Sequence, residues 1–219
     1  MADNKPSDVE GSYDLVADEY IRNIYDELRH KPLDRQLLDK FADKVRGVGS
    51  VCDLGCGPGH IARYLHEHNV DVRGVDLSPA MVERARGLNP GIVFTTGDMR
   101  QLSVADNTWI GIAAFYAIVN LPPEDVALAA KEIHRVLRPR GLLLMSFHVG
   151  DDLVHLDDWW GHAVSIDFHF YRPDAVAGYL IQAGMEIEEI VEREPYPEVE
   201  HQSRRAYIFA RKPAGSIAR

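Results

Sequence analysis

The chain has 219 residues, of which 46% are apolar and 26% are charged, as in one soluble globular domain. Lys and Arg number 24 against 34 Asp and Glu, which gives a formal net charge of -10. Because clustered basic side chains supply most affinity for a phosphate backbone, this balance argues against a nucleic-acid partner. The longest strongly apolar stretch, residues 110–121, is too short to span a bilayer, so we expect no membrane partner. The first residues are polar and acidic, which is unlike a secretory signal, and we expect a cytoplasmic protein.

The first part of the chain predicts two helices. Apolar residues recur every three or four positions from Tyr13 to Leu28 and again from Leu33 to Val45. We expect residues 1–12 to form a disordered tail, residues 13–212 a single domain and residues 213–219 a second tail.

From residue 50 onward, short apolar runs alternate with helical patterns. This rhythm predicts an α/β fold with a doubly wound, mostly parallel sheet of seven strands, because apolar strands need cover on both faces. The expected strands are residues 51–54, 71–76, 92–96, 110–115, 142–148, 186–191 and 205–210. Residues 148–172 interrupt the rhythm, and we treat them as an insertion.

The sequence DLGCGPGH, residues 53–60, follows the first expected strand. Glycines at this turn allow a ligand to approach the backbone closely. A dinucleotide fingerprint aligned on Gly55 requires glycine at position 60, which is His60, and no Gly-Lys-Ser/Thr follows for a P-loop. Cys52 and Cys56 cannot complete a zinc site, so we expect no metal.

The stretch VCDLGCGPGH resembles the first motif of the class I S-adenosylmethionine-dependent methyltransferases. Within that family it is most similar to the small-molecule type, whose domains are known as methyltransferase domains 11 and 25. The similarity continues over residues 13–147, including DLSPAM from Asp76 and Gly97-Asp98-Met99. It implies the Rossmann-like methyltransferase fold, S-adenosylmethionine as the cofactor and S-adenosylhomocysteine as the product. In such a site Asp76 holds the ribose and Asp98 the adenine. The implied cofactor-binding residues are Tyr13, Tyr20, Asp53, Gly55, Cys56, Gly57, Gly59, Asp76, Leu77, Met81, Asp98, Met99 and Phe115.

The resemblance also covers YDLVADEY, residues 13–20, and implies that residues 13–47 form a helical lid over the cofactor. Tyr13 and Tyr20 would then contribute hydroxyls to the site. Core anchoring of an amphipathic helix explains the same two tyrosines equally well, and the sequence leaves both interpretations open.

Residues that contact the methyl acceptor should lie beyond the ends of the fourth and fifth strands. His148 is the candidate general base, with a hydrogen-bonded strand end as the alternative. Tyr116 and Asn120 follow the fourth strand, although a turn role is the simpler one for Asn120. Arg204 and Arg205 either meet an anionic substrate or, as we favour, cap the sheet edge.

The insertion carries the remaining acceptor-side candidates, Trp159, Trp160 and His162. Its aromatic content indicates a pocket wall or a contact in a homodimer. A plain strand pair is the alternative, since SIDFHFY, residues 165–171, alternates apolar and polar residues.

The sequence therefore predicts a methyltransferase that moves a methyl group to O, N, S or C of a small molecule by in-line displacement. Two alternatives remain: a methyltransferase acting on protein or RNA, and a protein that binds S-adenosylmethionine without catalysis. An NAD-dependent oxidoreductase is disfavoured by His60.

Overall fold

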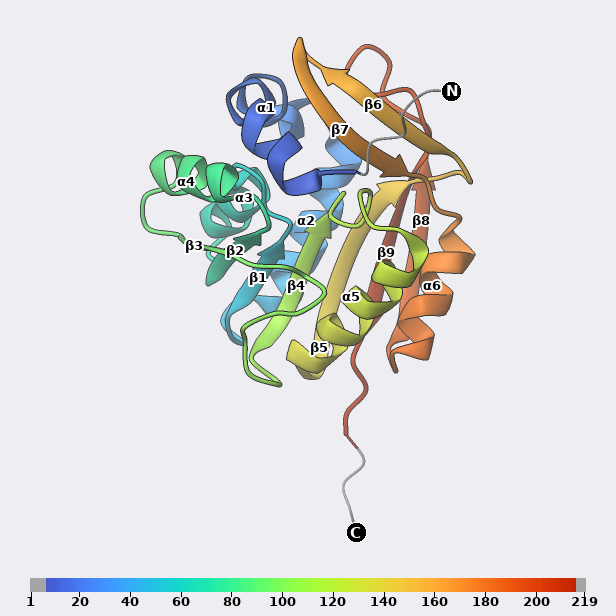
Figure 1. Ribbon diagram of the computed structural model, residues 1–219. Helices are drawn as coiled ribbons and strands as arrows, with labels where there is room; N and C mark the ends of the chain where they lie inside the picture. Colours follow the sequence, from blue (N-terminus) through green and yellow to red (C-terminus); the bar gives the residue numbers. More distant parts are fainter. Residues whose placement is uncertain (1–6, 216–219) are drawn as a thin grey trace.

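Seven strands form the central sheet in the computed structural model, which describes residues 7–215 (Figure 1). The order across the sheet is β3-β2-β1-β4-β5-β9-β8, and β9 runs antiparallel to both of its neighbours. The doubly wound, mostly parallel sheet predicted from the sequence is confirmed. The strands are β1 (Val51–Leu54), β2 (Val72–Asp76), β3 (Val93–Thr96), β4 (Trp109–Phe115), β5 (Leu137–His148), β8 (Glu186–Arg193) and β9 (Arg205–Arg211).

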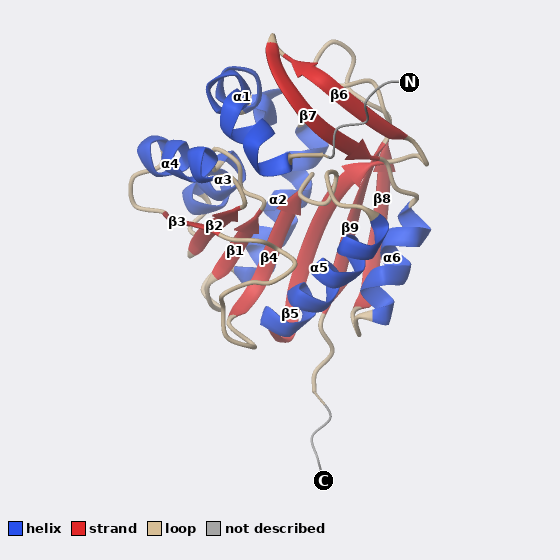
Figure 2. Cartoon of the chain, viewed as in Figure 1, coloured by secondary structure: helices blue, strands red, loops and turns tan. Residues whose placement is uncertain are grey.

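Helices cover both faces of this sheet (Figure 2). Side chains of β4 alternate between two buried clusters: Ile112 packs with α5 and α6, and Ala113 packs with α2, α3 and α4. This double burial explains why a central strand such as β4 is apolar along its whole length. The covering helices are α2 (Pro32–Val45), α3 (His60–Glu67), α4 (Pro79–Leu88), α5 (Pro123–Val136) and α6 (Pro173–Gln182).

The N-terminal helix α1 (Val9–Ile24) packs against α4 and against the strand β7, beyond the carboxyl ends of the parallel strands (Figure 1). A short 3-10 helix, η1 (Glu27–His30), joins it to α2. The Asp8 side chain caps α1 by accepting the N–H of Gly11 at 3.0 Å. Asp14 accepts the N–H of Ala80 at 3.0 Å and so fastens α1 to the start of α4.

The predicted tail of residues 1–12 is too long, because the cap at Asp8 starts α1 at Val9. Residues 1–6 of that tail, and residues 216–219 of the second one, lie outside the described residues.

The insertion is a β-hairpin of β6 (Leu153–Trp159) and β7 (His162–His169), as the strand-pair alternative predicted. Trp160 and Gly161 make its turn with positive φ angles of 55° and 83°.

Strand β5 begins at Leu137, five residues before the expected start at 142, because Leu137 pairs with Trp109 ahead of an irregularity in the β4–β5 register.

Candidate active site

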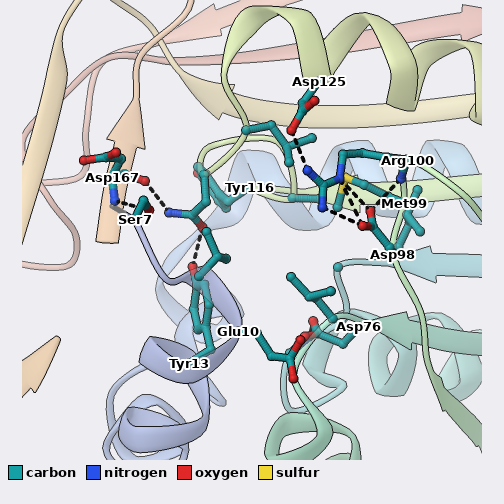
Figure 3. A pocket seen from close by; sticks show the side chains of 18 of the residues that line it. Ser7, Glu10, Tyr13, Asp76, Asp98, Met99, Arg100, Tyr116, Asp125 and Asp167 are labelled. Atoms are coloured by element: carbon teal, nitrogen blue, oxygen red, sulfur yellow. Dashed lines mark hydrogen bonds and ion pairs between the residues drawn. The ribbon is translucent and has the colours of Figure 1, made fainter. Parts of the chain in front are cut away.

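A cavity of about 550 Å³ lies beyond the carboxyl ends of β1, β2 and β4, under α1 (Figure 3). In an open parallel sheet this is the usual ligand position, and the volume falls within the range of about 300–1,000 Å³ for ligand pockets. Figure 3 shows Asp76, Asp98 and Met99 on the sheet side and Tyr13 and Glu10 on α1.

The glycine turn after β1 forms one wall of this cavity. Gly55 and Gly57 both have positive φ angles, 70° and 49°. A Cβ on Gly55 would lie 2.7 Å from the Cβ of Ala117, so only glycine fits there. The N–H of Gly57 donates to Asp76 Oδ2 at 2.7 Å, which fixes the turn against the end of β2.

Asp76 is the carboxylate best placed to accept ligand hydroxyls. Its Oδ1 also accepts the N–H of Ser78, at 2.9 Å. Burial raises the pKa of Asp76, and the N–H donors of Ser78 and Gly57 act in the opposite direction. Each carboxylate oxygen has two lone pairs, so a second hydrogen bond at each oxygen remains available.

Asp98 forms an ion pair that the sequence did not predict. Arg100 Nη2 lies 2.6 Å from Asp98 Oδ2, and Arg100 Nη1 lies 2.6 Å from Asp125 Oδ2 (Figure 3). The hydrogen bonds from Arg100 lower the pKa of Asp98. An adenine amino group at this position would therefore share Asp98 with the guanidinium.

The charged residues that line the cavity are mainly acidic. Among the described residues that line it, Arg100 is the only Lys or Arg. An acidic lining favours a cationic ligand and disfavours a pyrophosphate, because like charges in a partly buried site repel each other. A sulfonium cofactor with an α-ammonium group fits this charge pattern. The acidic lining residues are Asp8, Glu10, Asp76, Asp98, Asp125 and Asp167.

Four predicted cofactor residues lie behind the cavity wall rather than on it. Asp53 Oδ2 accepts the N–H of Ala62 at 2.9 Å and so caps the first turn of α3. Gly59 packs tightly on Phe94. Cys56 and Met81 are buried, with 2% and 0% of their surface exposed. We therefore assign a supporting role to this group of Asp53, Cys56, Gly59 and Met81. The predicted cofactor residues on the wall are Tyr13, Tyr20, Gly55, Gly57, Asp76, Leu77, Asp98, Met99 and Phe115.

A second cavity, of about 340 Å³, adjoins the first. The two share a wall made by Tyr13, Tyr20 and Tyr116. Of the acceptor-side candidates, Tyr116, His148, Trp159 and Trp160 line the second cavity, and Asn120 lines the first.

His162 lines neither cavity. It is the first residue of β7 and pairs with Trp159 beside the hairpin turn. Asn120 has a bridging position: its Oδ1 accepts the hydroxyl of Tyr13 at 2.9 Å, and its Nδ2 donates to the carbonyl of Asp167 at 2.7 Å. Asn120 thus ties α1 to the hairpin, a role that the turn interpretation did not include.

His148 ends β5, and its Nδ1 lies 2.8 Å from the Ser203 hydroxyl. Burial, together with the nearby Arg205 charge, lowers the pKa of His148 to about 3. The imidazole is therefore neutral at pH 7, as a general base must be, although a low pKa also makes it a weaker base. Its catalytic role stays a prediction.

The second cavity holds two buried cations, of which Lys31 was not predicted as a functional residue and Arg205 was given a substrate contact only as the less favoured alternative. Lys31 is 3% exposed and Arg205 is 2% exposed, and both line this cavity. The expectation that Arg205 caps a sheet edge is incomplete, because the side chain also faces the acceptor side. A sequence pattern does not reveal such burial, since Lys and Arg are ordinarily exposed.

The comparisons with known proteins agree with this geometry. Residues 51–141 match the methyltransferase domain family. Over residues 51–141 this match agrees with the resemblance that the motifs predicted.

Two curated relatives illustrate the match. The malonyl-[acyl-carrier protein] O-methyltransferase of Pseudescherichia vulneris is 30% identical over 149 residues, which are 65% of this chain and 57% of the relative. The ubiquinone/menaquinone biosynthesis C-methyltransferase UbiE of Desulfotalea psychrophila is 31% identical over 144 residues, 63% of this chain and 57% of the relative. The chain thus spans little more than half the length of these relatives.

A solved structure supports the fold. The S-adenosylmethionine-dependent methyltransferase of Methanosarcina mazei superposes with a TM-score of 0.68 at 18% identity, over 75% of this chain and 92% of that one.

Within residues 7–215, no group of three or more His, Cys, Asp or Glu side chains is arranged to hold a metal. No helix in the same range is both long and apolar enough to cross a membrane.

Proposed function

We propose that this protein is a methyltransferase that transfers a methyl group from S-adenosylmethionine to O, N, S or C of a small molecule. The observation that carries the proposal is the pair of adjoining cavities. The first is acidic and bounded by the glycine turn and Asp76, and the second is lined by aromatic residues. A donor and an acceptor placed in them would face each other across Tyr13, Tyr20 and Tyr116.

The residues of the first cavity fit the cofactor in charge and in hydrogen-bonding capacity. Asp76 would accept ribose hydroxyls, and Asp98 the adenine amino group, with Leu77 and Met99 as apolar neighbours of the base. S-adenosylmethionine supplies an already activated methyl group, so the protein needs only to align the reactants and to exclude water.

Alignment is the task that the chain's own groups perform. Tyr13 and Tyr20, on α1, cover the junction of the two cavities and contact Trp159 of the hairpin, with ring centroids 5.4 and 5.9 Å apart. This aromatic cover shields the junction from solvent. Positioning of this kind lowers the activation barrier of well-oriented reactions by about 7–11 kcal/mol.

Calorimetry tests the proposal directly. We expect S-adenosylmethionine and S-adenosylhomocysteine each to bind one site per chain and to raise the melting temperature, whereas NADH leaves both readouts unchanged. Binding of NADH with no response to either sulfur compound would overturn the proposal.

The acceptor class distinguishes the remaining alternatives. A protein or RNA acceptor predicts transfer of labelled methyl to macromolecules, and a binding protein predicts saturable cofactor binding without transfer to any acceptor. The small size of the second cavity, about 340 Å³, supports a small molecule. A homodimer and a cytoplasmic location stay predictions.

A further inference from the structure

The second cavity has an aromatic wall. Trp159 stacks on Trp160 with centroids 4.9 Å apart and meets Phe168 edge to face at 5.4 Å. Tyr20 completes this side from α1, at 5.9 Å from Trp159 and 6.1 Å from Trp160. Such surfaces favour a flat ring, which gains both apolar burial and ring–ring contacts.

One end of the same cavity is charged. Lys31 Nζ lies 2.7 Å from Glu27 Oε2 and 3.2 Å from Glu200 Oε2, and Arg205 Nη2 lies 3.5 Å from that same oxygen of Glu200. The Lys31, Glu200 and Arg205 side chains are only 2–4% exposed. Charges as buried as these are held by their partners, so their arrangement is fixed before a ligand arrives.

Two groups at this end that can donate hydrogen bonds have no partner in the described part of the chain. Glu27 already faces Lys31 and His60. Glu200 pairs with Lys31 and accepts hydrogen bonds from Arg193 and from the Tyr196 N–H. Among the described residues, in contrast, the buried Arg205 Nε and the buried Tyr116 hydroxyl have no hydrogen-bond partner. Unused donors beside two cations suit a ligand oxygen that carries negative charge.

Tyr116 places this end next to the cofactor cavity. Its ring lies 5.3 Å from Lys31 Nζ and 5.7 Å from the Arg205 guanidinium carbon, and Tyr116 lines both cavities. It also has a positive φ of 53°, which is unfavourable for a tyrosine and is typical of functional sites. An oxygen held beside Lys31 and Arg205 is therefore at the shared wall.

We infer that the methyl acceptor is a small aromatic alcohol, of the phenol or hydroquinone class, whose ring lies among Tyr20, Trp159 and Phe168 and whose oxygen lies beside Lys31, Arg205 and Tyr116. This inference rests on the proposed function and names its acceptor. An amine acceptor is disfavoured, because its cation would meet the two buried cations Lys31 and Arg205.

In the transfer, the phenolic oxygen gives up its proton and attacks the methyl carbon. The new O–C bond forms as the C–S bond breaks, and the electron pair of that bond stays on sulfur. Lys31 and Arg205 stabilise the phenolate before attack, and His148, neutral and on the same cavity, or solvent takes the proton. The products are an aryl methyl ether, S-adenosylhomocysteine and a proton.

A chromogenic nitrophenol tests this inference, because its ionised form absorbs visible light. We expect it to bind the complex of the protein with S-adenosylhomocysteine, and its bound form to ionise at least about one pH unit below the free probe. Glu27, Glu200, His148 and His201 also line the cavity, so the titration is compared between wild type and Lys31→Gln. The variant should lose most of the shift, and Lys31→Arg should restore it.

Two further comparisons keep the result interpretable if Lys31→Gln is unstable. Trp160→Ala, at a residue 40% exposed, should weaken nitrophenol binding about tenfold, whereas Leu153→Ala, 59% exposed on the same hairpin but outside the cavity, should not. Tighter binding of benzylamine than of the phenol, or an ionisation midpoint that is unchanged or raised, overturns the inference. In either case intact binding of S-adenosylhomocysteine shows that the failure concerns the acceptor and leaves the cofactor site unaffected.

Discussion

Asp76 Oδ2 accepts the backbone N–H of Gly57 at 2.7 Å, so the carboxylate at the end of β2 holds the glycine turn that follows β1. One side chain therefore shapes the turn and also lines the cavity where the cofactor is proposed to bind. The two motifs that the sequence presents separately, around Gly57 and Asp76, act as one unit.

Asp76→Ala should weaken S-adenosylmethionine binding by about 1.5–3 kcal/mol, because charged hydrogen bonds to the ribose are lost. Calorimetry measures the change. Asp71→Ala, at an exposed position just before β2, is the matched control and should bind normally. Equal affinity of Asp76→Ala and wild type would contradict the ribose assignment.

Arg100→Ala should bind S-adenosylmethionine at least as tightly as wild type. The substitution frees the Asp98 carboxylate, now paired with Arg100 at 2.6 Å, and removes a positive charge from an acidic cavity. Asp98→Ala should bind more weakly, and titrations of the two variants give the comparison. Weaker binding by Arg100→Ala would indicate that the guanidinium itself contacts the cofactor.

Gly59→Ala and Gly57→Ala should separate folding from ligand binding. A Cβ on Gly59, where φ is 81°, would lie 2.7 Å from Phe94 Cζ, so Gly59→Ala should lose about 1–3 kcal/mol of unfolding free energy. At Gly57 the nearest atom is Tyr20 Cε1 at 3.7 Å, so the larger effect there should be on cofactor affinity.

Urea unfolding and calorimetry report the two effects of these glycine substitutions. Gly178→Ala, where a Cβ meets no atom within 4 Å, serves as the control and should be neutral or stabilising. A larger loss of stability at position 57 than at position 59 would contradict the assignment.

His148→Gln should reduce the pH dependence of stability on the acid side. The pKa of His148 is lowered to about 3 in the folded protein, against about 6.5 for an unfolded chain, so between these values the unfolded state binds more protons. Stability contributed by neutral His148 is therefore complete above pH 6.5 and is lost as the pH falls toward 3.

Urea unfolding of wild type and His148→Gln between pH 7 and pH 4 measures this dependence. The variant should show a shallower decline from about pH 6.5 downward. Equal slopes for the two proteins would indicate that His148 titrates normally. In the same variant, lower turnover with normal cofactor affinity would support the catalytic assignment.

The sequence predicted the sheet, and many of its candidate cofactor residues line one cavity, for physical reasons. Strands buried on both faces are mostly apolar, as in 142–145, and the glycine turn with Asp76 is a local pattern that a motif captures. Whether a residue lies on the cavity wall or behind it is not local. Asp53 and Met81 stand in the expected motifs, yet they support the wall from the interior.

The charged end of the second cavity was beyond prediction from a single sequence. Lys31, Glu200 and Arg205 are separated by up to 174 positions and meet only after α2 and β9 have packed on the sheet. Residues of these types are normally exposed, so nothing local distinguishes buried members from the others. The sequence predicted the hairpin only as one of two alternatives. Its Trp160-Gly161 turn has positive φ at both residues, as common two-residue turns do, but Trp160 stands where Asn, Asp or Gly is usual.

A structure of the protein with S-adenosylhomocysteine bound tests the central claim most directly. The account predicts the ribose hydroxyls on Asp76, the adenine beside Leu77 and Met99, and the sulfur directed toward Tyr116 and the second cavity. A ligand bound elsewhere, or one whose ribose lies away from Asp76, would contradict it.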